Sequence, residues 1–88
     1  MSWHSMVMAD SELIKLRRDL AREYRHEIAA GRLAGYTVFS RKRDGGDHTL
    51  FVPPAAIALF ERMPSWKKRL TPYEGTPDLS RSEAVPVR

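Results

Sequence analysis

Cysteine is absent from the 88-residue sequence, which excludes disulfide bonds and thiolate metal sites. Long apolar runs are absent too, since none approaches the roughly 18 residues that a membrane-spanning helix needs. Residues 1–9 lack the basic start and the apolar stretch of a secretory signal peptide. We therefore expect no membrane span and, by default, a cytoplasmic location.

Motifs for catalysis or cofactor binding are also missing. The sequence has no glycine-rich phosphate loop, no HExxH pair and no nucleophile elbow. Its three histidines, His4, His26 and His48, fall in separate segments and form no recognisable set of metal ligands. A chain of this length leaves little room for a catalytic cleft. We expect a protein that is not an enzyme and that has no catalytic residues, metal, cofactor or small-molecule substrate.

The strongest structural signal is a β-hairpin. Two runs rich in β-branched and aromatic residues flank the turn sequence Asp-Gly-Gly-Asp at residues 44–47. Glycine adopts positive φ at little cost, as tight hairpin turns require. The pattern predicts strands near residues 36–42 and 48–52.

Two positions for the turn are open, and they give two registers. If Asp44-Gly45 is the turn, Phe39 lies opposite Leu50; if Gly45-Gly46 is the turn, Phe39 lies opposite Val52. In either register the hairpin is apolar on both faces, because successive residues point to opposite sides. A two-stranded hairpin is marginal alone, so its faces and edges need cover from helices or from a partner.

Residues 11–30 are typical of an amphipathic helix with three faces. Apolar residues at helical spacing form a core-facing stripe, with Asp10 expected to cap the helix start and Gly31 expected to follow its end. A basic face lies opposite the stripe and contains Lys15, Arg18, Arg22 and Arg25. A third, acidic face contains Glu12, Asp19 and Glu23. Arg17 interrupts the stripe: it either extends its charged end to solvent or meets a carboxylate or phosphate across an interface.

Proline marks the boundaries of the remaining elements. Pro54 suits the first position of a helix over residues 54–63, which is apolar nearly all round and ends at Pro64. Ser65 then caps a short helical turn. Residues 71–88, with three prolines and few apolar residues, are expected to be an extended or disordered tail.

The sequence therefore predicts one small α+β domain over residues 10–70. Its element order is α-β-β-α, with a two-stranded antiparallel hairpin packed by helices, a short C-terminal helical turn and a flexible tail. Residues 1–9 are expected to be a flexible leader, with either Met1 or Met8 as the natural start.

Cations are concentrated in the predicted domain. Residues 10–70 carry 13 Lys/Arg against 8 Asp/Glu, whereas residues 71–88 carry 2 against 3. The candidate phosphate contacts are the basic helix face, the hairpin end and a cluster around one tryptophan: Lys15, Arg18, Arg22, Arg25, Arg41, Lys42, Arg43, Trp66, Lys67, Lys68 and Arg69. Each set also has a plainer interpretation, respectively a solvated helix face, protection of a strand edge, and core packing of the indole.

Two hypotheses about function follow. The first is a small binding protein, acting as a regulator, adaptor or inhibitor through protein contacts or as a homodimer. Its contact residues would be the apolar hairpin positions and the interrupting arginine: Val38, Phe39, Leu50, Phe51 and Arg17. The second is a nucleic-acid-binding protein that uses the basic helix face and the hairpin end. One continuous basic face would favour nucleic acid, and scattered patches would favour protein contacts.

Overall fold

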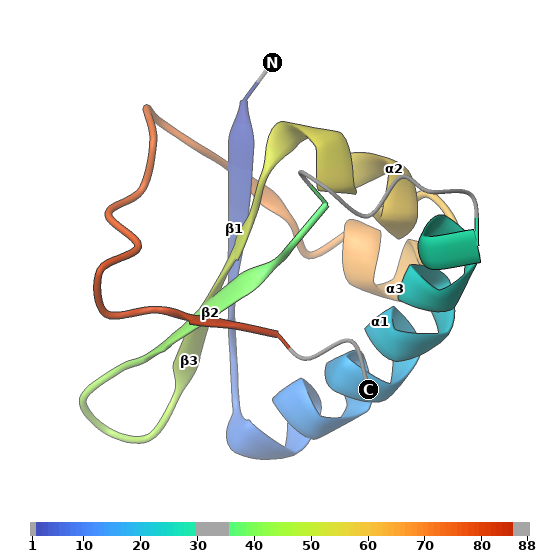
Figure 1. The fold of residues 1–88 in the computed structure, drawn as a ribbon. Coiled ribbons are helices and arrows are strands. Elements are labelled where there is room, and N and C mark those ends of the chain that lie inside the picture. Colours follow the sequence, from blue (N-terminus) through green and yellow to red (C-terminus); the bar gives the residue numbers. More distant parts are fainter. Residues whose placement is uncertain (1, 30–35, 86–88) are drawn as a thin grey trace.

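The computed structural model describes residues 2–29 and 36–85, in which one long helix and several short ones accompany five strands in an α+β fold. Its five strands form one antiparallel sheet in the order β4-β1-β3-β2-β5, and the helices pack on one face of that sheet (Figure 1). The elements are β1 (Trp3–Met8), α1 (Asp10–Ala29), β2 (Phe39–Lys42), β3 (His48–Val52), η1 (Pro54–Ala56), α2 (Ile57–Phe60), α3 (Pro64–Lys67), β4 (Thr71–Tyr73) and β5 (Glu83–Ala84).

The long helix forms where periodicity predicts it, but its start is capped differently. The Ala9 carbonyl accepts the first helical hydrogen bonds, and Glu12 Oε1 accepts the Ala9 N–H at 3.1 Å. This is the back half of a capping box, with alanine at the N-cap position. The predicted cap Asp10 is instead the first helical residue, and its carboxylate contacts His48 Nε2. The predicted role of Gly31 lies outside the described residues.

The hairpin strands are confirmed, but both predicted registers are wrong. Phe39 lies opposite Phe51, which is the register between the two alternatives. The Arg43 N–H donates to the Asp47 carbonyl at 2.7 Å, so three residues rather than two form the loop. Gly45 and Gly46 both have φ of 93°, and two consecutive left-handed glycines allow this longer loop.

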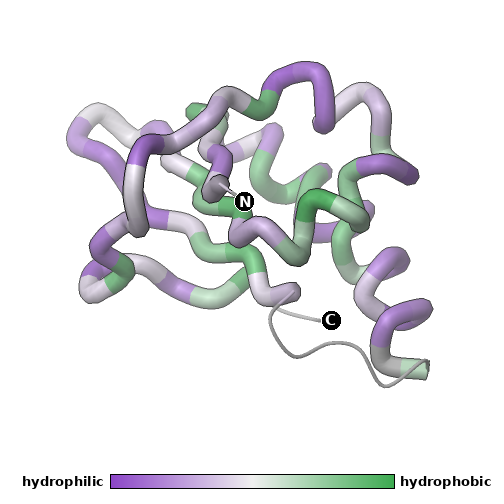
Figure 2. The backbone as a smooth tube through the Cα atoms, turned by 90° about the horizontal axis from the view of Figure 1, so that it is seen from above, coloured by the Kyte–Doolittle hydropathy of each residue, from purple (hydrophilic) through white to green (hydrophobic). Residues whose placement is uncertain are grey.

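This register gives the hairpin its two apolar faces. Val38, Leu50 and Val52 belong to the core between sheet and helices, with Ser40 on the same face. Phe39 and Phe51 lie on the face away from the helices. Figure 2 shows the hydrophobic stretches in the middle of the molecule and the strongly hydrophilic ones mostly at its periphery.

Residues 3–8 correct the expectation of a flexible leader. They form β1, which lies between β3 and β4 and pairs with both. Met6 and Met8 are only 4% and 2% exposed. The alternation of Trp3–Met8 places both methionines on the helix side, and the edge of β3 provides the pairing that a leader would lack.

Residues 71–85 correct the expectation of a flexible tail. β4 pairs with β1 at one edge of the sheet and β5 pairs with β2 at the other. The connecting residues 74–82 therefore cross from edge to edge, and they run past the face that the helices leave open (Figure 1). Val85 joins the core at 2% exposure, and its N–H donates to the Val38 carbonyl at 2.8 Å.

The second predicted helix is split into short pieces. Residues 54–56 form a 3-10 turn, α2 follows directly, and Pro64 opens α3 rather than only ending its predecessor. Leu59 and Phe60 are fully buried, as expected for a helix that is apolar nearly all round.

Candidate anion-binding site at the hairpin end

Two adjoining hollows lie at the end of the sheet from which the hairpin projects. The inner hollow, of about 170 Å³, is lined by Arg17, Ser40, Lys42, His48, Arg81 and Glu83. The outer hollow, of about 360 Å³, is lined by Arg41, Lys42, Arg43, Asp44 and Arg81. Lys42 and Arg81 line both, so the two hollows form one basic region, called here the hairpin-end site.

Strand alternation explains why the site has two compartments. Lys42 and His48 are directly opposed on β2 and β3, on the face that α1 covers, and Arg17 comes from α1 itself. Arg41 is on the other face, where its guanidinium lies 5.2 Å from the centre of the Phe51 ring. Arg81 precedes β5 at the sheet edge, where it lines both compartments.

Within residues 2–29 and 36–85, the cations of the hairpin-end site form no ion pair with a carboxylate. Among the described residues, none of five cations forms an ion pair: Arg17, Arg41, Lys42, Arg43 and Arg81. The Arg17 Nε atom is buried, and no described group accepts a hydrogen bond from it. The two linings together include two carboxylates, Asp44 and Glu83. Positive charges therefore outnumber negative charges in the site, but they are not the only charges there.

A third carboxylate lies close by. Asp78 has its pKa lowered mainly by hydrogen bonds from Ser80, whose N–H donates at 3.0 Å, and further by the nearby charges of Arg41 and Arg81.

The ring of His48 is oriented by Asp10, which contacts its Nε2. Because Asp10 contacts Nε2, the other ring nitrogen of His48, Nδ1, is not engaged by Asp10.

The predicted basic helix face is exposed but lies elsewhere. Lys15, Arg18, Arg22 and Arg25 are all exposed on the side of α1 opposite its buried stripe. Arg22 is 3.6 Å from both Asp19 and Glu23. These four residues line neither hollow of the hairpin-end site, and the loop between β2 and β3 extends away from the helices (Figure 1).

The predicted cluster around Trp66 is mainly structural. The indole is 8% exposed, and its N–H donates to Asp19 Oδ2 at 2.8 Å. Arg69 binds Glu12 at 2.5 Å, and its guanidinium lies 5.5 Å from the centre of the Trp66 ring. Because Trp66 is packed and its N–H is bonded, the structure favours the plainer interpretation of core packing over base stacking. Lys67 pairs with Glu61 at 2.7 Å, and Lys68 is exposed.

The predicted protein-contact residues are mostly core residues. Val38 and Leu50 are 0% exposed and Phe51 is 1% exposed, so they offer no surface to a partner. The cause is the chain's own cover: the Tyr73 ring meets Phe51 edge-on at 5.4 Å, and β1 and β5 occupy the hairpin's edges. Phe39 remains half-buried, and Arg17 lines the inner hollow.

Five residues that line the two hollows were not among the candidate site residues of the sequence: Ser40, Asp44, His48, Arg81 and Glu83. Arg81 and Glu83 were assigned to a flexible tail, and only the pairing of β5 with β2 would have placed them beside Lys42. Ser40 is 6% exposed and was hidden in a strand pattern.

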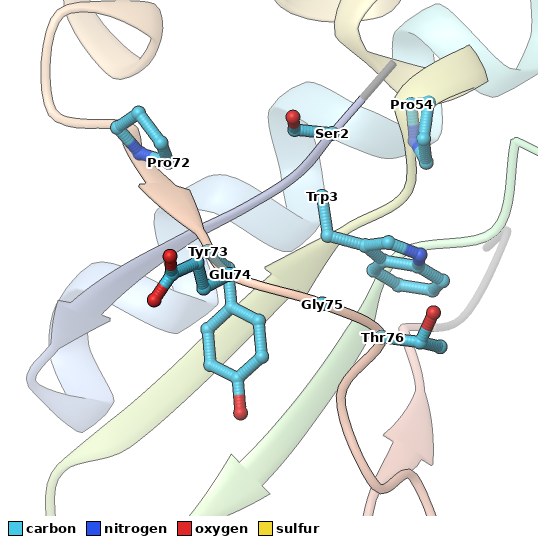
Figure 3. Close-up of a pocket in the computed structure, with 8 residues that line it drawn as sticks. All are labelled: Ser2, Trp3, Pro54, Pro72, Tyr73, Glu74, Gly75 and Thr76. Carbon is cyan, nitrogen blue, oxygen red and sulfur yellow. The ribbon is translucent and has the colours of Figure 1, made fainter.

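A larger, open hollow lies at the opposite end of the sheet. It has a volume of about 700 Å³ and is lined by Ser2, Trp3, Pro54, Pro72, Tyr73, Glu74, Gly75 and Thr76. Trp3 and Tyr73 are cross-strand partners on β1 and β4. Figure 3 shows the indole pointing towards Thr76 and the phenol ring pointing in a different direction.

Searches for relatives give no family assignment. No known protein family, curated protein or solved structure matches this chain. Within residues 2–29 and 36–85, no group of three or more His, Cys, Asp or Glu side chains is placed to hold a metal ion. No helix of the described part is long and apolar enough to cross a membrane.

Proposed function

We propose that this protein is a non-enzymatic binding protein that binds nucleic acid through the hairpin-end site. The observation that carries the proposal is the gathering, around two adjoining hollows, of five cations that form no ion pair in the described part of the chain. Four of the five are arginines, whose planar guanidinium groups suit phosphate oxygens. A row of phosphates spanning both compartments would supply the missing counter-charges.

The contrast with the other cations supports this choice. Arg62, Lys67 and Arg69 each bind a carboxylate within the chain, so their charges already have partners. Binding a phosphate at the hairpin end breaks no ion pair between residues that the structure describes. The exposed basic helix face lines neither hollow, so the cations do not form the one continuous face that would favour nucleic acid most directly, and the proposal rests on the hairpin-end site alone.

Salt dependence provides the test. If about four phosphates are neutralised, affinity for a duplex or single-stranded oligonucleotide should fall by roughly two decades between 50 and 200 mM salt. Changing Lys42→Gln and Arg43→Gln together should flatten the slope of log K against log salt by about two phosphates' worth. Both residues are exposed, so the fold should be unaffected.

The matched control is Lys15→Gln with Arg18→Gln, which removes the same charge from the exposed helix face. It should leave affinity within about twofold, apart from a small change in long-range attraction. An equal loss in both double variants would mean that net charge, rather than the hairpin-end site, drives binding. Absence of binding at 50 mM salt would refute the proposal.

Protein contact remains a second candidate, at a different surface. The sequence favoured contacts through the hairpin, whose apolar residues, apart from the half-buried Phe39, are covered by the chain itself. The hollow beside Trp3 has prolines and aromatic rings on its wall, and such walls accommodate proline-rich segments in the polyproline II conformation.

A labelled proline-rich peptide would test this candidate. Trp3→Ala should weaken its binding at least about tenfold, because an aromatic anchor is lost. Val7→Ala serves as the control, since Val7 lies on the same face of β1 and is 45% exposed. Equal binding by both variants would exclude the hollow as the docking site.

A further inference from the structure

The inner hollow differs from the outer one in size and in the origin of its wall. At about 170 Å³ it is smaller than the 300–1,000 Å³ typical of pockets that hold drug-sized ligands. It corresponds to about six water molecules at roughly 30 Å³ each. A phosphate group with some hydration fits this space, whereas a nucleoside requires the adjoining outer hollow or open solvent.

The wall of the inner hollow is assembled from four separate segments. Arg17 comes from α1, Lys42 and Ser40 come from β2, His48 comes from β3, and Arg81 with Glu83 comes from the C-terminal segment. Three permanent cations therefore reach one small space from different directions. The carboxylate of Glu83, which is exposed, reduces the net positive charge of the wall by one.

Arg17 provides the independent sign that a ligand belongs here. Its Nε atom is buried with no hydrogen-bond partner among the described residues, although the guanidinium carries five N–H donors. A buried donor without an acceptor costs free energy, and an anion that draws the Arg17 guanidinium into the hollow would give this donor an acceptor. Ser40, which is 6% exposed, adds a hydroxyl-bearing side chain to the wall.

The charge of the ligand follows from the number of cations. A terminal phosphate monoester carries about −1.5 to −2 charges at pH 7 and has three free oxygens. A phosphodiester inside a nucleic-acid strand carries a single charge, and sugars continue the chain on both sides of it. A small space with three cations favours the monoester on both grounds.

We infer that the inner hollow binds a terminal phosphate, so that the protein prefers a phosphorylated end of a nucleic-acid strand. The outer hollow would then hold the next part of the strand, because the two compartments share Lys42 and Arg81. This inference rests on the proposed function and assigns the ligand class of its inner compartment.

The experiment compares ends of one single-stranded oligonucleotide with the full chain. Three versions carry a 5′-phosphate, a 3′-phosphate or hydroxyls at both ends, each with a label in the middle of the strand. One of the phosphorylated ends should bind at least about tenfold more tightly than the hydroxyl version, since a charge-assisted set of hydrogen bonds is added. Comparing the two phosphorylated versions identifies which end is recognised.

Variants then connect the preference to the inner hollow. Arg17→Gln should reduce the ratio between phosphorylated and hydroxyl ends to near one, while weaker salt-dependent binding to both remains. Lys15→Gln, a matched loss of one charge from the same helix, should retain the ratio. Arg81→Gln is a second variant at an exposed position and should also lower the ratio, in case Arg17→Gln perturbs the fold.

The outcomes separate the two proposals. Equal affinity of the unaltered protein for all three versions would overturn the terminal-phosphate inference and leave nucleic-acid binding standing. A preference that survives in both Arg17→Gln and Arg81→Gln would place the phosphate elsewhere and overturn the assignment of the hollow. Failure to bind any version at 50 mM salt would remove the proposed function and this inference with it.

Discussion

The helix layer and the hairpin end both carry several cations, but only the helix layer supplies them with partners. Arg62 binds Glu23 at 2.6 Å and Glu27 at 3.1 Å, and Arg69 binds Glu12 at 2.5 Å. The cations of the hairpin-end site have no such pairs among the described residues. Identical residue types therefore hold the fold together in one region and stay available to a ligand in the other.

The acidic face of α1 accounts for the difference. Glu12, Asp19 and Glu23 bind groups from the segment that contains α2 and α3, including the Trp66 indole. The hydrogen bonds that Arg62 donates to Glu23 and Glu27 raise the pKa of its guanidinium, which keeps it charged. No comparable acidic face borders the hairpin-end site within the described part of the chain, so charge counts alone could not separate the two regions.

Removing the C-terminal segment should break the comparison most severely. A chain that ends at Leu70 loses β4, β5 and Arg81. The truncation also exposes the Phe51 ring and removes Val85 from the core. Burying each such apolar side chain contributes about 1.5–3 kcal/mol. The expected loss of at least about 3 kcal/mol is a large part of the 5–15 kcal/mol typical of a domain. Thermal unfolding monitored by circular dichroism measures this loss of stability.

Ala84→Ser in the full chain is the control for this truncation, since Ala84 is exposed in β5 and should change stability by less than about 0.5 kcal/mol. A truncated chain that melts within a few degrees of the full one would show that residues 71–88 add little to the fold.

The same segment shows where sequence reasoning stops. Periodicity found α1, and the turn glycines with β-branched runs found β2 and β3, because these signals are local. The short edge strands β1, β4 and β5 carry weak local signals and form because neighbouring edges offer hydrogen bonds. The hairpin-end cations at residues 41–43 were identified from sequence, whereas their meeting with Arg17 and Arg81 depends on those non-local pairings.

The next largest effect should come from the paired region. Arg62→Gln removes the cation shared by Glu23 and Glu27, which are 6% and 3% exposed. Loss of a charged partner from buried carboxylates is expected to cost about 2 kcal/mol, less than for a fully buried pair because the Arg62 side chain is 47% exposed. Urea denaturation gives the free energy of unfolding. Lys68→Gln, at an exposed cation without an ion pair in the described part, should cost less than about 0.5 kcal/mol.

Arg62→Gln also sharpens the comparison between the regions. It should leave oligonucleotide affinity unchanged at a temperature where the variant remains folded, because Arg62 lies outside the hairpin-end site. A variant as stable as the unaltered protein would mean that the ion pairs of the helix layer contribute nothing net.

The smallest expected effect concerns pH and tests the pair between Glu12 and Arg69. The hydrogen bond from Arg69 is the main cause that lowers the pKa of Glu12 below its ordinary value of 4.5. A carboxyl whose folded-state pKa is depressed stabilises the protein above the unfolded-state pKa, and this contribution is lost as pH falls through the folded value.

Glu12→Gln should therefore lower the melting temperature by a small amount at pH 6, and the difference should shrink steadily below pH 4.5. Glu74→Gln, at an exposed carboxylate without an ion pair in the described part, is the matched control. Glutamine can keep neutral hydrogen bonds but cannot form the ion pair. If the difference in melting temperature between Glu12→Gln and the unaltered protein stayed constant from pH 6 to pH 3, the ion pair would contribute nothing to the stability of the helix layer.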